Sequence, residues 1–281
     1  MKDLQGKVAV VTGAASGLGR AMALAFAAEG MHVALADVDE ANLARVAAEV
    51  RAHGVRALAR RVDVSRGEQV DELAQHTVAE LGGAHLVCNN AGVSPLGAAW
   101  ENTVADWQWT LGVNLWGVIH GVRAFAPLLL AQEEGHIVNT ASVAGLISPP
   151  GMGAYNVSKH AVVALSESLY HDLAERKVRV GVSVLCPAYV PTAISDSERN
   201  RPAELANPAR PKSAQLLAKE AMLRKAVQSG KISADEVAQA VVAAVRGERF
   251  YILTHPRIKA AIRARLEDIL EERAPRNPLA L

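Results

Sequence analysis

The sequence predicts one α/β domain in which a doubly wound parallel sheet of seven strands carries helices on both faces. Two observations predict this fold. Short apolar runs rich in valine alternate with longer segments of helical period almost to the end of the chain, which is the pattern of repeated βα units. The length of 281 residues, half of them apolar, fits one large core, so we expect residues 1–281 to form a single domain.

The expected elements follow one another along the chain. Strands are expected at residues 7–12, 31–36, 55–62, 84–88, 135–140, 178–185 and 249–254. Helices are expected at residues 17–29, 39–53, 67–82, 103–132, 153–176, 213–229 and 233–247. A further amphipathic helix is expected at about 256–273, and its apolar side consists of Ile258, Ile262, Leu266 and Ile269. We expect that side to pack on the domain or on a neighbouring subunit rather than on a membrane.

One segment, residues 186–212, fits none of these elements. It contains five prolines and is long for a connection within a compact domain. It follows the carboxyl end of the sixth expected strand, where doubly wound sheets bind ligands. We therefore expect a substrate lid at about 186–225.

The composition excludes several classes of function. Thirty basic and 29 acidic side chains give a net charge of +1 without any block of like charges, so we expect no nucleic-acid partner. Cys88 and Cys186 lie in apolar runs without metal-ligand spacing, so we expect two core residues and no metal site. No apolar stretch of bilayer length is evident, and the first residues lead directly into a strand. These features favour a reduced, cytoplasmic protein.

A glycine-rich turn follows the first expected strand. Gly13, Gly17 and Gly19 lie in the segment Thr12–Gly19, directly before an alanine-rich helix. Glycines let the backbone approach a pyrophosphate closely, and the free N–H groups of the helix start favour its negative charge. The spacing GxxxGxG differs from the general GxGxxG fingerprint, so a tight turn without a ligand stays an alternative.

Asp37 ends the second expected strand about twenty residues after the glycines, where an acidic group can hold the ribose hydroxyls of a dinucleotide. Neither Val38 nor the turn residues Ala15 and Ser16 supply a cation for the 2′-phosphate of NADP. The sequence thus favours NAD over NADP. In the alternative interpretation Asp37 only caps the next helix.

Two more polar turns end at the same predicted edge of the sheet. Asp63-Val64 ends the third expected strand, and Asn89-Asn90-Ala91-Gly92 ends the fourth. Both are expected beside the cofactor. Plain turn chemistry is the alternative, because Asp, Asn and Gly are frequent in loops for local reasons.

Tyr155 and Lys159 lie four residues apart in one expected helix, so they share a face. A nearby ammonium stabilises a phenolate, and lowering the Tyr155 pKa by about 2–3 units would need roughly 3–4 kcal/mol. Tyr155 would then exchange a proton with an alcohol or carbonyl. Ser142 follows the fifth strand and could hold the substrate oxygen.

In combination these motifs resemble the short-chain dehydrogenase/reductase family, in its compact classical branch. The match runs through most of the chain and consists of Thr12-Gly13-xxx-Gly17-x-Gly19, Asn89-Asn90-Ala91-Gly92, Ser142, and Tyr155-Asn156-Val157-Ser158-Lys159. The resemblance implies a Rossmann-type fold and catalysis by Ser142, Tyr155 and Lys159.

The resemblance also implies roles for further residues. Lys159 would hold the nicotinamide ribose, and Asn114 would help relay protons through water or, alternatively, have only a structural role. Pro187-Ala188 stands where the family has Pro-Gly, and Val190 and Thr192 would contact the nicotinamide carboxamide. The cofactor-binding set implied by the matching motifs is Gly13, Ser16, Gly17, Leu18, Gly19, Asp37, Asp63, Val64, Asn90, Ala91, Gly92, Tyr155, Lys159, Pro187, Val190 and Thr192. By analogy with the family we expect a homotetramer or homodimer formed through the long helices.

The expected function is NAD-dependent interconversion of a hydrophobic secondary alcohol and its ketone. Segments 93–100, about 143–153 and 186–225 would set the substrate, through the apolar candidates Val93, Leu96, Trp100, Leu146, Ile147, Met152, Tyr189 and Ile194. The alternatives are an NADPH-dependent reductase of the ketoacyl type and a non-catalytic dinucleotide-binding regulator.

Overall fold

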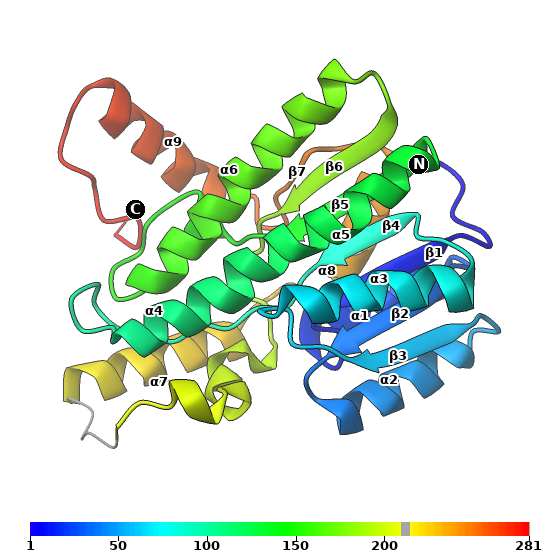
Figure 1. Cartoon of the computed structure of the whole chain (residues 1–281). Coiled ribbons are helices and arrows are strands. Elements are labelled where there is room, and N and C mark those ends of the chain that lie inside the picture. The colour runs from blue at the N-terminus through cyan, green and yellow to red at the C-terminus, as the bar shows by residue number, and fades with distance from the viewer. Residues whose placement is uncertain (209–213, 281) are drawn as a thin grey trace.

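The computed structural model, which describes residues 1–208 and 214–280, contains the expected single parallel sheet. Its seven strands lie in the order β3-β2-β1-β4-β5-β6-β7 (Figure 1). The strands are β1 Val8–Thr12, β2 His32–Asp37, β3 Ala57–Arg61, β4 Leu86–Asn89, β5 Glu134–Thr140, β6 Arg179–Leu185 and β7 Tyr251–Ile252. The order reverses between β1 and β4, which is the switch point where doubly wound sheets open a ligand crevice.

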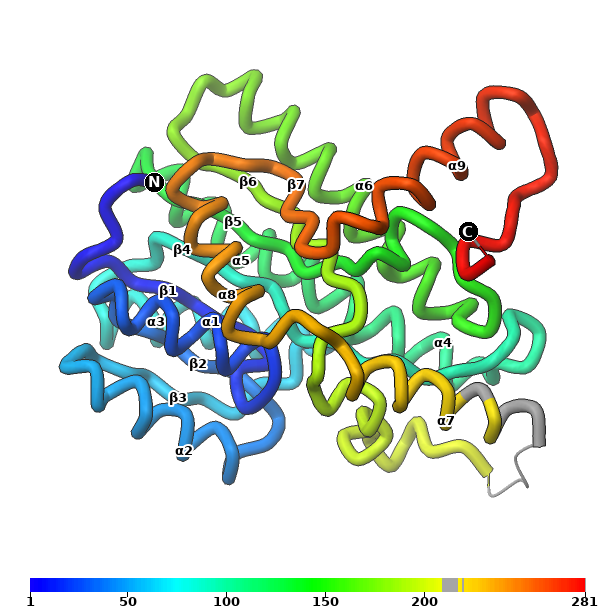
Figure 2. The backbone as a smooth tube through the Cα atoms, turned by 180° about the vertical axis from the view of Figure 1, so that it is seen from behind, coloured from blue at the N-terminus to red at the C-terminus, as the bar shows by residue number. Residues whose placement is uncertain are grey.

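Helices cover both faces of the sheet because successive strand residues point to opposite sides. Ala9 and Val11 of β1 belong to the core cluster formed with α1 Gly17–Ala28, α2 Glu40–Arg51 and α8 Ala234–Arg246. Val8 and Val10 belong to the opposite cluster, formed with α3 Gly67–Leu81, α5 Gly117–Ala131 and α6 Gly153–Glu175. Figures 1 and 2 show these two helical layers from opposite sides.

The long helix expected at 103–132 consists of three parts. α4 Val104–Leu111 begins at a capping box, in which the Thr103 hydroxyl accepts from the Asp106 N–H and the Asp106 carboxylate accepts from the Thr103 N–H. A π-helical segment, η1 Gly112–Trp116, joins it to α5. Such π segments are frequent at functional sites.

This continuous helical run, Val104–Ala131, is long and apolar enough to cross a membrane by length and composition alone. The expectation that the chain has no apolar stretch of bilayer length was wrong by this measure, because the polar residues spread through the run conceal its high mean hydropathy. In the structure the run packs against β4, β5, α3 and α6, and core helices of this kind pass the same test. One third of its most apolar window is buried, so much of its apolar surface faces outward.

The segment after β6, which belongs to the expected lid, forms short helical turns. They are η3 Ala193–Asn200 and η4 Ala203–Leu205, followed by α7 Ala214–Gln228. Residues 209–213, which belong to the expected lid and include the first residue of the expected helix 213–229, lie outside the described residues.

The C-terminal helix α9 Ile258–Leu270 is present, and it projects from one end of the domain (Figures 1 and 2). Within the chain its expected apolar side is only partly covered, because Ile258 and Ile262 are half-buried whereas Leu266 and Ile269 are exposed. Ala261, Ala264 and Asp268 are buried, since the chain after α9 folds back on the helix and the Arg276 guanidinium binds the Asp268 carboxylate at 2.9 Å. Packing of the exposed side on a neighbouring subunit stays a prediction.

Candidate active site

A groove of about 750 Å³ opens along the carboxyl ends of β1, β2, β4, β5 and β6. The parallel strands bring all the strand-end motifs of the sequence to this one edge. From the glycine turn and the loops after β2, β3 and β4, the groove is lined by Gly13, Ser16, Gly17, Leu18, Asp37, Asp63, Val64, Asn90, Ala91 and Gly92. From the loops after β5 and β6 and from α6, it is lined by Ser142, Tyr155, Lys159, Pro187, Val190 and Thr192. Gly19 and Asn114 are the two predicted site residues that do not line it.

The glycine turn leaves no room for side chains. Gly13 has a φ of +66°, and a Cβ there would lie 2.8 Å from the Ala91 Cα. A Cβ on Gly19 would overlap the carbonyl oxygen of Gly13, so Gly19 shapes the turn from behind the groove. The Ser16 side chain makes no capping hydrogen bond to α1, which leaves first-turn N–H groups available. This arrangement fits an anionic pyrophosphate.

Asp37 lies at the rim of the groove and is not a helix cap. Its Oδ2 accepts from the Ala15 N–H at 2.9 Å and its Oδ1 from the Asp39 N–H at 3.0 Å. The residue that caps α2 is Asp39, whose side chain accepts from the Asn42 N–H. The carboxylate of Asp37 is thus tied to the glycine turn, as a ribose-binding group requires.

A cation that the sequence analysis missed lies beside Asp37. Arg61 is the register partner of Asp37 across β2 and β3, and it also lines the groove. Arg61 could not be predicted from the residues next to Asp37 in the sequence, because the pairing register of β2 and β3 is set by tertiary packing.

The turn after β3 makes local turn hydrogen bonds and also lines the groove, so both interpretations of this turn stay open. The Asp63 carboxylate accepts from the Ser65 N–H at 3.0 Å and from the Ser65 hydroxyl at 2.7 Å, which is ordinary turn chemistry. Asp63 and Val64 nevertheless line the groove.

Ser142, Tyr155 and Lys159 meet where β5, α6 and the loop after β6 converge. Ser142 and Tyr155 both line the groove, and Ser142 lies close enough to the Tyr155 hydroxyl to lower the pKa of that group. The Lys159 ammonium lies 5.6 Å from the centre of the Tyr155 ring and donates to the Thr140 carbonyl at 2.9 Å. The amine therefore faces the tyrosine, as the sequence predicts.

The predicted direction of the Tyr155 pKa shift was wrong. Burial raises the pKa of Tyr155, and the hydrogen bond from Ser142 lowers it by less. Burial also lowers the pKa of Lys159 to about 8, so the cation expected to stabilise the phenolate is itself destabilised. Sequence spacing indicates that two groups are neighbours, but it does not reveal the desolvation that both undergo.

Comparison with known proteins identifies the family. A model of the short chain dehydrogenase family matches residues 7–203, which is well over half of the chain. The chain belongs to the short-chain dehydrogenase/reductase family. It is an oxidoreductase that acts on CH–OH groups and has a nicotinamide dinucleotide site.

Relatives and solved structures cover nearly the whole chain. A Burkholderia phymatum short-chain dehydrogenase/reductase crystallised with NAD is similar, with 54% identity, a TM-score of 0.97 and coverage of 100% of both chains. The 1-deoxy-11-beta-hydroxypentalenate dehydrogenase of Streptomyces exfoliatus is 36% identical over 95% of this chain and 89% of that one. The CLA biosynthesis dehydrogenase/reductase of Lactiplantibacillus plantarum is 33% identical over 98% and 97%, respectively.

Asn114 of this dehydrogenase/reductase lies behind the groove in η1. Its Oδ1 accepts from the Val93 N–H at 2.8 Å, and its Nδ2 donates to the Val93 carbonyl at 2.9 Å and to the Ser158 hydroxyl at 3.1 Å. The side chain therefore holds the loop after β4 in place. The proton relay through Asn114 stays a prediction.

The apolar substrate-lining candidates divide sharply. Val93 and Ile194 line the groove. The six others do not line it: Leu96, Trp100, Leu146, Ile147, Met152 and Tyr189. Trp100 is 87% exposed. The groove is instead lined there by residues that no motif indicated, from α4, from the turns after β6 and from α7: Gln108, Trp109, Arg199, Arg201, Leu205 and Val227.

Proposed function

We propose that this short-chain dehydrogenase/reductase interconverts a hydrophobic secondary alcohol and its ketone with NAD as cofactor. The observation that carries the proposal is the meeting of Ser142, Tyr155 and Lys159 beside a groove that begins at the glycine turn. Transfer of the hydroxyl proton to Tyr155 and of a hydride from the carbinol carbon together account for the oxidation.

In the alcohol-to-ketone direction, Ser142 donates a hydrogen bond to the substrate oxygen and Tyr155 removes the hydroxyl proton. A bound NAD⁺, held by the glycine turn and Asp37, would supply the hydride acceptor. Lys159, anchored on the Thr140 carbonyl, brings positive charge within reach of the Tyr155 ring and favours its ionised form. In the reverse direction Tyr155 returns the proton to the carbonyl oxygen, and its raised pKa suits this donor role.

NAD rather than NADP is proposed because the Asp37 carboxylate at the groove rim would repel a 2′-phosphate. Arg61 beside it is the one specific observation that favours the alternative, an NADPH-dependent ketoacyl-type reductase. The ratio of kcat/KM for NAD⁺ and NADP⁺ decides between them.

A hydrophobic substrate is proposed because Val93, Ile194, Leu205 and Val227 line the groove. The similar Streptomyces enzyme is by name a dehydrogenase of a hydroxypentalenate, and such a hydroxyl substrate fits this lining. A panel of alicyclic and aromatic secondary alcohols with NAD⁺, followed by the absorbance of the reduced cofactor, tests the substrate class.

Replacing Tyr155 with Phe tests the mechanism. The variant is expected to lose at least about 10²-fold in kcat, as for removal of a general acid–base group, while NADH binding persists. NADH binding with full activity would overturn the assignment of Tyr155. Binding without turnover in the wild-type protein, across the whole panel, would favour the non-catalytic dinucleotide-binding regulator.

A further inference from the structure

A short segment after β6, which we call the strap and define as residues 192–207, lies along one side of the groove. Its members Thr192, Ile194, Arg201 and Leu205 line the groove, as do other strap residues. A segment in this position governs access to whatever the groove binds. The inference below rests on the proposed dinucleotide function of the groove.

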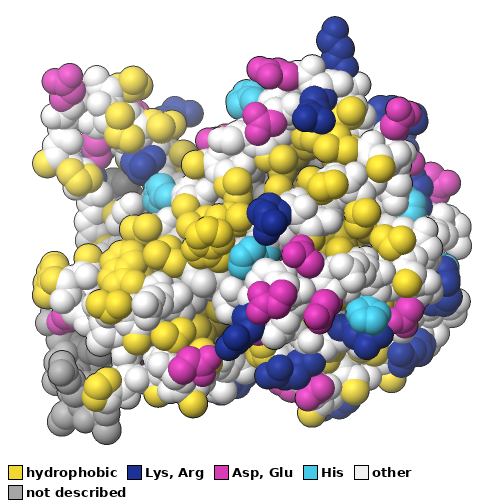
Figure 3. All heavy atoms as spheres, in the orientation of Figure 1, with side chains coloured by type: hydrophobic (Ala, Val, Ile, Leu, Met, Phe, Trp, Pro, Cys, Tyr) yellow, Lys and Arg dark blue, Asp and Glu magenta, His cyan; other side chains and the backbone are white. Residues whose placement is uncertain are grey.

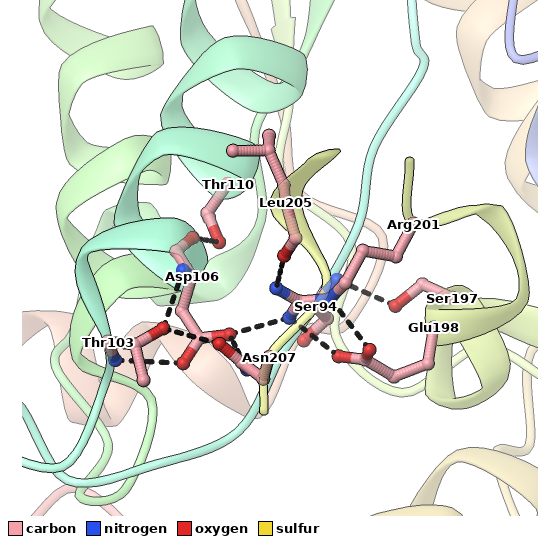
Figure 4. Close-up of polar contacts among 9 residues, drawn as sticks. All are labelled: Ser94, Thr103, Asp106, Thr110, Ser197, Glu198, Arg201, Leu205 and Asn207. Atoms are coloured by element: carbon pink, nitrogen blue, oxygen red, sulfur yellow. Dashed lines mark hydrogen bonds and ion pairs between the residues drawn. The ribbon is translucent and has the colours of Figure 1, made fainter. Parts of the chain in front are cut away.

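One strap residue, Arg201, is inserted between the strap and α4 (Figure 4). Its side chain is 6% exposed, and its Nη2 lies 2.6 Å from the Asp106 Oδ1, on a carboxylate that is 10% exposed. The guanidinium also donates to the Leu205 carbonyl at 3.1 Å and to the Glu198 carboxylate at 2.8 Å. Its carbon Cζ lies 4.3 Å from the centre of the Trp109 ring.

Asp106 serves α4 and the strap with different oxygens. Its Oδ2 accepts from the Thr103 N–H and closes the capping box of α4. Its Oδ1 accepts from Arg201 and, at 2.8 Å, from the Asn207 Nδ2. Burial alone would raise the pKa of Asp106, but these hydrogen bonds together lower it, so the carboxylate stays charged. The negative charge is thus held jointly by the N-terminus of α4 and by the strap residues Arg201 and Asn207.

The strap has a second, neutral attachment, to the loop after β4. The buried Ser197 hydroxyl accepts from the Ser94 N–H at 3.1 Å, just after the Asn-Asn-Ala-Gly turn. Other ion pairs of the strap, Arg66 with Glu204 and Arg224 with Asp196, join exposed side chains. Exposed pairs contribute little, whereas breaking a buried pair leaves an uncompensated charge.

We infer that Arg201 is a positioning residue that, through Asp106 and Trp109, holds the strap along the groove and thereby slows release of the dinucleotide. It acts through the strap rather than on the reacting atoms. Arg201 lies 95 positions from Asp106 and 92 positions from Trp109 along the chain, so the attachment exists only in the folded protein.

The test compares Arg201→Met with Arg224→Met. Arg224 is the matched control, because it also pairs with a strap carboxylate, that of Asp196 at 2.9 Å, but is exposed and does not belong to the groove lining. Stopped-flow displacement of NADH should show release about tenfold faster for Arg201→Met, equivalent to ~1.4 kcal/mol, and within twofold of wild type for Arg224→Met. Hydrogen exchange in residues 192–207 should rise for Arg201→Met alone.

Two further variants test the same inference if Arg201→Met folds poorly. Asp106→Asn removes the charge and should reproduce the faster release, and adding Arg201→Met to it should change the release rate little further. Arg201→Lys keeps the positive charge but lacks the planar guanidinium, so its NADH release rate should lie between those of the wild type and Arg201→Met. A lowered melting temperature with an unchanged NADH release rate would show a structural role alone and overturn the inference. Failure of the wild-type protein to bind NADH would instead overturn the proposed function.

Discussion

Lys159 shows at the scale of one residue how the site is maintained at the expense of stability. It is 3% exposed, with its ammonium on the Thr140 carbonyl, and burial lowers its pKa to about 8. A buried ammonium whose pKa lies below its unfolded value of about 10.4 destabilises the folded state at neutral pH by about 3 kcal/mol. Proteins retain such groups where function requires them.

Lys159→Met is therefore expected to change the pH dependence of stability. Below pH 8 both states of the wild type hold the proton and the full penalty applies. Between pH 8 and about 10.4 the unfolded chain still holds it while the folded chain releases it, so wild-type stability rises with pH. The variant lacks this rise. The free energy of unfolding in urea, relative to wild type, should be highest for Lys159→Met below pH 8 and fall towards pH 10.

Lys225→Met is the control for this experiment, because Lys225 is exposed on α7. Its difference from wild type should stay constant over the same pH range. An equally constant difference for Lys159→Met would contradict the assigned burial penalty. Loss of dehydrogenase activity in Lys159→Met is expected in either case.

The pair of Asp37 and Arg61 gives a second prediction at this scale. Asp37→Ser removes the carboxylate that repels a 2′-phosphate, and it leaves Arg61 at the rim to bind one. The ratio of kcat/KM for NADP⁺ over NAD⁺ should rise about tenfold or more, or ~1.4 kcal/mol. Asp39→Ser, which alters the cap of α2 outside the groove lining, should leave this ratio unchanged. If Asp37→Ser also leaves it unchanged, another residue sets the cofactor preference.

At the scale of elements, α5 approaches β4 closely at one glycine. A Cβ on Gly121 would overlap the Asn89 Oδ1, and the Asn89 amide is buried and donates to the Asn139 Oδ1 at 2.9 Å. The helix therefore lies on the sheet at a separation that only glycine permits. Alanine is the better helix former, but here it has no space.

Gly121→Ala is expected to destabilise the fold by about 1–3 kcal/mol, because the Asn89 amide must move and lose its partner. Gly112→Ala is the control in the same helical run, where the nearest atom to a new Cβ is the Ser65 Cβ at an ordinary 3.4 Å. That variant should be neutral or more stable by up to about 1 kcal/mol. Urea unfolding of both variants measures the contrast, and equal stabilities would contradict the close approach.

Much of the arrangement of helices and strands, and of the candidate site, could be predicted from the sequence, since strand ends and helix caps depend on local residues. β5 begins one residue before its expected start, and the strand-end motifs do line one groove. Features that depend on distant contacts could not be predicted. The Arg201 attachment and the register partner Arg61 are of this kind, as is the reduction of β7 to two residues. The direction of the Tyr155 pKa shift failed for the same reason, because burial is set by the whole packed structure.

At the scale of the whole molecule, an apolar surface lies over α4 and the start of α5 (Figure 3). Its members include Val104, which is 73% exposed, and Trp116, which is 51% exposed; Val157 of the neighbouring α6 is also exposed. Contiguous exposed apolar residues, aromatic ones above all, mark protein interfaces. The proposed partner is a second copy of this chain, in keeping with the homodimer or homotetramer that the family resemblance implies.

Trp116→Glu is expected to separate the proposed oligomer into smaller species. In an interface with twofold symmetry the same surface faces itself, so one substitution introduces two carboxylates into the apolar contact. Sedimentation velocity should show a lower mass for Trp116→Glu than for wild type at the same concentration. Met222→Glu is the control, because Met222 is exposed on a different helix, α7, and should leave the mass unchanged. A wild-type protein that sediments as a monomer at all concentrations would remove the basis of this proposal without touching the active-site assignment, since the groove is formed within one chain.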